Sequence, residues 1–127
     1  MDSKSFEDLL KKIEKIGRNE VYDIEAYAFI LEALHQVVSK LDKPRHISGT
    51  ELLQGIKDYA IKQFGSFTLQ VFHHWGVRST EDFGRMVFDL VDAELLRKQP
   101  EDKLEDFMNI YRFEDVFLKT LQFEDVP

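Results

Sequence analysis

The sequence contains no cysteine. This absence excludes disulfide bonds, thiolate catalysis, and zinc or iron–sulfur sites built on cysteine, and it is compatible with a reducing compartment. No apolar run approaches the ~18–20 residues that span a membrane. Residues 1–14 alternate charged and apolar side chains and lack the apolar stretch of a signal peptide. We therefore expect a cytoplasmic protein that has no membrane segment.

The motifs of several common enzyme classes are also missing. There is no phosphate loop, no glycine-rich dinucleotide fingerprint, no nucleophile elbow and no H-E-x-x-H zinc motif. Adjacent acids such as Glu101-Asp102 are typical of a solvated face, and nothing marks a cleft in which two carboxyls would act on a glycoside. We expect a non-enzymatic protein with no catalytic residue, cofactor or metal.

The charge is unevenly distributed along the chain. Residues 1–78 carry eleven basic and eleven acidic side chains, whereas residues 79–127 carry six basic and thirteen acidic ones, which accounts for the whole formal charge of −7. An acidic field repels phosphate backbones and attracts basic surfaces. We therefore expect weak or no binding to duplex DNA.

Apolar residues recur at helical spacing in five segments. They predict helices over 5–16, 22–41, 49–64, 67–75 and 80–94. Ser48 with Glu51, and Ser79 with Asp82, have the spacing of helix-capping pairs. The predicted core is centred on the helix 22–41 and comprises Phe29, Ile30, Leu34, Leu53, Ile56, Phe72, Trp75, Val87 and Leu90.

The pattern changes after residue 94. Met108 and Ile110 alternate with Phe107, Asn109 and Tyr111, which favours a strand. We expect a β-hairpin within 95–113 and a final helical turn over 114–122. The fold class is therefore mainly α: a tri-helical, winged-helix-like part over 47–122, preceded by two helices within 5–41, in one domain spanning 1–127.

Two groups of residues are candidate sites. Arg45, His46 and Ser48, joined by Arg78, offer a positive, hydrogen-bonding corner near a helix N-terminus, where an anion could bind. The alternative is that these side chains only cap the backbone or contact acidic neighbours. His73 and His74 are adjacent, so on a helix they point about 100° apart and cannot readily share one metal.

The second candidate is a partner surface in the acidic C-terminal part. Large aromatic residues are interleaved there with acids, whereas a purely solvating tail would be poor in aromatics. Some of these rings must pack on the domain, and Phe123 is the one we expect to remain exposed. The proposed surface comprises Phe113, Glu114, Asp115, Phe123, Glu124 and Asp125.

Most of the chain, from about Tyr22 to Phe117, resembles a small bacterial family of uncharacterised conserved proteins. The resemblance rests on the strings YAFILEAL at 27–34, RHISGTELL at 45–53 and HWGVRSTEDFG at 74–84. It implies a compact single-domain protein. It brings no activity, cofactor or catalytic residue, because the family has no assigned function.

Three classes of function remain open at this point. The favoured one is an interaction domain whose acidic part meets a basic protein or protein–RNA assembly, or a second copy of the chain. The second is a nucleic-acid-associated or regulatory winged-helix protein that contacts phosphate through Arg45, His46 and Arg78. The third is a ligand-binding protein or enzyme that uses His46, His73 or His74.

Overall fold

The structure of the protein is a computed structural model, and it describes residues 7–8, 11–12, 14–15 and 21–117. It is mainly helical, as predicted. Its elements are α2 (Ile24–Ser39), α3 (Gly49–Phe64), the short 3₁₀ helix η1 (Gly65–Phe67), α4 (Thr68–His74), α5 (Thr80–Asp92) and the 3₁₀ helix η2 (Leu104–Phe107). The described residues of the predicted helix 5–16 are helical, and so is the backbone at 113–117.

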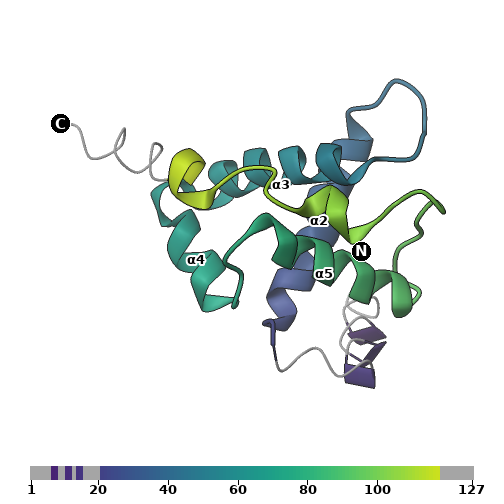
Figure 1. Ribbon diagram of the computed structural model, residues 1–127, viewed down its shortest axis with the longest axis horizontal. Helices are drawn as coiled ribbons and strands as arrows, with labels where there is room; N and C mark the ends of the chain where they lie inside the picture. The colour runs from purple at the N-terminus through teal and green to yellow at the C-terminus, as the bar shows by residue number, and fades with distance from the viewer. Residues whose placement is uncertain (1–6, 9–10, 13, 16–20, 118–127) are drawn as a thin grey trace.

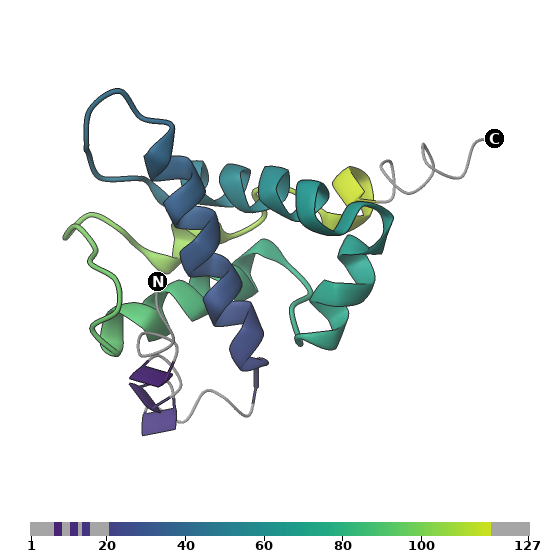
Figure 2. The same cartoon turned by 180° about the vertical axis from the view of Figure 1, so that it is seen from behind.

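The helices are arranged in layers. Figures 1 and 2 show α2 crossing one side of α3 and α5, with the segment 104–117 on the opposite side. α4 joins α3 to α5 at one edge. No helix in the part of the chain that the structure describes is both long and apolar enough to cross a membrane.

Local capping fixes where α3 and α5 begin. The Ser48 hydroxyl accepts from the Glu51 N–H at 3.1 Å, and the Glu51 carboxylate accepts from the Ser48 N–H at 3.0 Å. At α5, the Asp82 carboxylate accepts from the Ser79 N–H at 3.2 Å. Both pairs predicted from the sequence are confirmed. They satisfy N–H groups that have no partner within the helix, so each helix starts at a defined residue.

The core is dominated by aromatic rings around Phe72. This ring lies 5.2 Å from Phe83, 5.4 Å from Phe113 and 5.3 Å from Phe117, measured between ring centroids. Seven of the nine predicted core residues are buried; Leu34 and Val87 are only half-buried. The prediction of the core is therefore correct except at these two positions.

The predicted β-hairpin over 95–113 is wrong, since the structure has no strand among its described residues. Its first arm instead finishes α5. The Leu90 carbonyl accepts from the N–H groups of Leu95 and Leu96, at 2.9 and 3.3 Å, and Glu94 takes the left-handed conformation with φ 62°. This is the usual way in which a chain reverses at a helix end. The N–H groups of Leu95 and Leu96 are therefore bonded at the end of the helix and do not pair with a second strand.

The second arm of the predicted hairpin is also bonded locally. The Asp106 carboxylate accepts from the Lys103 N–H at 3.0 Å and starts η2. Asn109 has φ 54°, outside the strand region. Without a strand pair there is no wing, so the winged-helix comparison finds no support here. The alternation separates inner from outer residues only in part: Phe107 is buried and Tyr111 half-buried, but Asn109 is exposed like Met108 and Ile110.

Phe107 closes the core by fitting against two glycines. A Cβ atom added at Gly84 would lie 2.6 Å from the Phe107 Cβ atom, and one added at Gly49 would lie 2.9 Å from the edge of the ring. Gly84 lies inside α5, where glycine costs roughly 1 kcal/mol relative to alanine. The close approach of Phe107 explains why a helix interior carries glycine at this position.

Gly84→Ala is therefore expected to destabilise the fold despite the better helix propensity of alanine. Overpacking costs about 1–3 kcal/mol and the helix gains about 1 kcal/mol, so we expect a net loss of up to about 2 kcal/mol in urea denaturation. Asp92→Ala, at an exposed position of the same helix, is the control and should change stability by less than about 0.5 kcal/mol. A higher stability of Gly84→Ala would show that the slot for Phe107 is loose.

Candidate functional site

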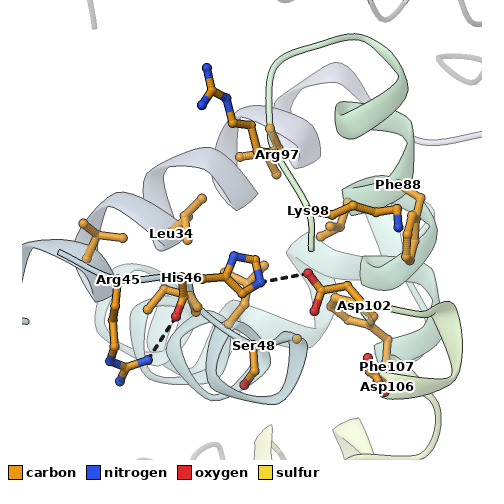
Figure 3. A pocket seen from close by; sticks show the side chains of 16 residues that line it. Leu34, Arg45, His46, Ser48, Phe88, Arg97, Lys98, Asp102, Asp106 and Phe107 are labelled. Carbon is orange, nitrogen blue, oxygen red and sulfur yellow. Dashed lines mark hydrogen bonds and ion pairs between the residues drawn. The ribbon is translucent and has the colours of Figure 1, made fainter. Parts of the chain in front are cut away.

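The predicted corner at Arg45, His46 and Ser48 lies at the edge of a cavity of about 210 Å³. The cavity is enclosed by α2, the loop that precedes α3, the first turn of α3, α5 and the segment 96–107 (Figure 3). Three of the four predicted corner residues therefore line one cavity, whose other walls come from elements far apart in the sequence.

The interior of this cavity is mostly apolar. α2 contributes Leu34 and Val38, and α5 contributes Val87 and Phe88. Leu34 and Val87 are the two predicted core residues that the structure leaves half-buried. Their helical spacing correctly indicated an inward face: both side chains pack against the core, and both also border the cavity.

His46 and Asp102 join two walls of the cavity. The His46 Nε2 atom lies 2.8 Å from an Asp102 carboxylate oxygen, which also accepts from the Gln99 N–H at 2.8 Å. When the imidazole is protonated, the contact is an ion pair. Sequence reasoning missed Asp102 as a site residue, because Glu101-Asp102 was interpreted as part of a solvated face. The two partners lie 56 positions apart.

Arg45 and Ser48 are engaged by the chain's own carboxylate. The Arg45 guanidinium donates to both carboxylate oxygens of Glu51, at 3.1 and 2.7 Å. The Ser48 hydroxyl accepts from the Glu51 N–H. The anion at this helix N-terminus in the structure is therefore Glu51 itself. The paired Arg45 guanidinium, together with the Ser48 N–H, lowers the pKa of Glu51 from 4.5 to about 2.

This pKa shift predicts a pH dependence of stability. A carboxylate whose pKa is lower in the folded state stabilises the fold above its unfolded pKa, here about 4.5, and loses that contribution as the pH falls towards 2. Glu51→Gln should therefore be less stable than the wild type above pH 4.5, and the difference should shrink between pH 4.5 and 2. Urea midpoints measured across this range check it. A difference that stays constant with pH would mean that the charge of Glu51 is not involved.

Arg78 does not join the corner. It lines a separate depression together with Arg112 and Glu114, and its backbone N–H donates to the Asp82 carboxylate at 2.8 Å. Phosphate contact through Arg45, His46 and Arg78 together would require the three on one surface. This arrangement therefore gives the nucleic-acid interpretation no support.

The two adjacent histidines predicted as a candidate lie at the end of α4. His73 and His74 are both exposed. Among the residues that the structure describes, no group of three or more histidine or acidic side chains is placed to hold a metal ion.

Only some residues of the predicted partner surface are exposed. Glu114 and Asp115 are exposed, but Phe113 is buried in the aromatic core. Its ring lies 5.4 Å from that of Phe72 and 6.1 Å from that of Phe83. Phe113 is therefore one of the rings that pack on the domain and does not belong to an exposed surface, because the helical turn at 113–117 presents its rings to α4 and α5. Phe123, Glu124 and Asp125 lie outside the described residues.

Sequence reasoning missed two surface residues beside these acids. Met108 and Ile110 are 37% and 36% exposed, and they lie two positions apart on the same segment. Two hydrogen bonds fix the chain next to these residues. The Ile110 N–H donates to the Thr80 hydroxyl at 3.4 Å, and the Tyr111 hydroxyl donates to the Leu53 carbonyl at 2.7 Å. The alternation over 107–111 was the available signal.

The comparisons with known proteins add no relative. The sequence matches no protein-family model, and neither the curated proteins nor the solved structures include one that matches it. The resemblance to an uncharacterised bacterial family therefore stays a prediction. The roles of the residues above rest on their geometry and chemistry alone.

Proposed function

We propose that the chain is a non-enzymatic interaction domain that binds a basic partner protein through an acidic face. The acidic face consists of Glu105, Met108, Ile110, Glu114 and Asp115. All five residues are exposed, and they lie on the segment that covers one side of α3 and α5 (Figure 1).

The single observation that carries this proposal is the sorting of side chains along 104–117. Phe107, Phe113 and Phe117 are buried, so the aromatic rings hold the segment on the core. Glu105, Glu114 and Asp115 remain outside with Met108 and Ile110, together with Asn109 and Arg112, whereas Asp106 is half-buried. Exposed apolar side chains among charged ones are a composition that protein interfaces use.

The charges of this face are largely uncompensated. Glu105 and Asp115 make no ion pair within the described part of the chain, and Glu114 lies 3.8 Å from the exposed Arg112. Exposed pairs of that kind contribute little to stability. Unpaired acids speed association with a basic surface and lose this effect at high salt.

The test compares two triple variants that change the charge equally. Glu105→Lys, Glu114→Lys and Asp115→Lys reverse the acidic face; Glu32→Lys, Asp42→Lys and Asp92→Lys reverse exposed acids elsewhere. Each variant and the wild type are used to capture proteins from the native host. We expect the wild type and the control variant to capture proteins that are rich in lysine and arginine. The variant with the reversed acidic face should not capture them, and high salt should release them from the wild type.

Recovery of the same proteins by the face variant would contradict the proposal. Loss of those proteins from both triple variants would also count against it, since it would reflect net charge rather than this face. Melting temperatures should be similar for all three proteins, because each changed residue is exposed.

A further inference from the structure

We propose that the cavity beside His46 binds a small amphipathic molecule with a short apolar chain and an anionic end group. This site shares no residue with the acidic face and does not depend on the proposed function. Four observations support it: the cavity's lining, its size, the state of its charged groups, and the contact that joins its walls.

The apolar side chains that line the cavity are incompletely buried. Val38 is 40% exposed at the cavity, and Leu34 and Val87 are half-buried there, although the other described members of the predicted core are buried. Removing apolar surface from water is favourable at roughly 25 cal/mol per Å². An apolar chain in the cavity would complete the burial of these residues.

The size of the cavity limits the length of that chain. Its volume of about 210 Å³ is below the ~300–1,000 Å³ of sites for drug-sized ligands. The volume suits a short apolar group and excludes a long acyl chain or a ligand with several rings.

The charged groups at the cavity favour an anion over a cation. Both acids in the lining are already engaged: Asp102 with His46 and the Gln99 N–H, and Asp106 with the Lys103 N–H. Three exposed cations line the cavity, and Arg45 is paired with Glu51, whereas Arg97 and Lys98 form no ion pair within the described residues. Arg97 extends into solvent, and Lys98 lies along Phe88, with its ammonium 5.9 Å from the ring centre (Figure 3).

The contact between His46 and Asp102 gives the cavity a defined wall. It ties the loop before α3 to the segment after α5 at 2.8 Å, so the site does not rest on side-chain packing alone. Preformed sites lose less conformational entropy when a ligand binds.

The test uses three eight-carbon probes, namely octanoate, octylamine and octanol, in isothermal titration of the full-length chain. We expect saturable binding of octanoate, weaker binding of octanol and the weakest binding of octylamine. Val38→Trp, which fills the cavity, should weaken octanoate binding at least about tenfold. Val21→Trp, at an exposed position that does not line the cavity, is the matched control and should bind like the wild type.

A second pair of variants tests the charge. Arg97→Glu with Lys98→Glu should abolish the preference for octanoate over octylamine, whereas Lys40→Glu with Lys62→Glu should retain it. No saturable octanoate binding would overturn the proposal, and so would equal binding by Val38→Trp or a wild-type preference for octylamine. Self-association that Val38→Trp blocks, without octanoate binding, would assign the cavity to a second copy of the chain. Melting curves show that each variant is folded.

Discussion

Replacing Phe72 with alanine is expected to lower the free energy of unfolding by about 3–5 kcal/mol. Phe72 is fully buried, and its ring contacts rings from α2, from α5 and from the helical turn at 113–117. Removing it therefore opens a cavity where several elements meet, and the neighbouring rings cannot all close on it. Urea denaturation followed by tryptophan fluorescence measures the loss, because Trp75 is stacked on Phe72 with centroids 6.0 Å apart.

Phe67→Ala is the control for this prediction. Phe67 precedes α4 and is 63% exposed, so its removal should change stability by less than about 0.5 kcal/mol. Equal stability of Phe72→Ala and Phe67→Ala would contradict the conclusion that Phe72 lies at the centre of the aromatic core.

Phe113→Ala is expected to cost a similar amount, about 3–5 kcal/mol. This side chain is 2% exposed and packs against Phe72, Phe83 and Phe117. The result distinguishes a core residue from the partner-surface residue that the sequence predicted. Thermal and urea denaturation of the variant provide the measurement.

The neighbouring Glu114→Ala serves as the comparison, and its stability should stay within about 0.5 kcal/mol of the wild type, since Glu114 is exposed. A stable Phe113→Ala variant that fails only in partner binding would restore the sequence-based interpretation and contradict the packing seen here.

The helices could be predicted from the sequence because their signals are local. The predicted range 49–64 coincides with α3, and 80–94 extends only two residues beyond α5. Capping pairs such as Ser48 with Glu51 act over three residues, and an apolar face repeats over a few turns. Those signals need no knowledge of the rest of the chain.

The segment 95–117 could not be predicted in the same way because its conformation depends on distant partners. Alternation at 107–111 is compatible with a strand, but three consecutive residues, 108–110, are exposed and the backbone there is not extended. Local hydrogen bonds at the end of α5 and the start of η2 shape the turns of this segment, and distant contacts place them: the slot that Gly49 and Gly84 leave for Phe107, and the bond from the Tyr111 hydroxyl to the Leu53 carbonyl. Contacts between residues so far apart along the chain produce no periodic pattern in the sequence.

For the same reason, the sequence predicted only some of the residues that line the cavity. Arg45, His46 and Ser48 are neighbours along the chain, so their grouping was a local inference. Asp102 comes from a segment more than fifty positions away, and Leu34 and Val87 lie on two different helices. A helical apolar face predicts an inward side chain but does not distinguish a packed neighbour from a cavity.

The acidic face is tested most directly by amide-resolved NMR of the full chain titrated with a short peptide of alternating lysine and leucine. The account predicts that chemical-shift changes are largest at Glu105, Met108, Ile110, Glu114 and Asp115, and that salt reverses them. Acids elsewhere, such as Glu25 and Glu32, should shift little, because they are not accompanied by Met108 and Ile110. Shifts that are spread evenly over all exposed acids, or concentrated outside 104–117, would contradict the central claim.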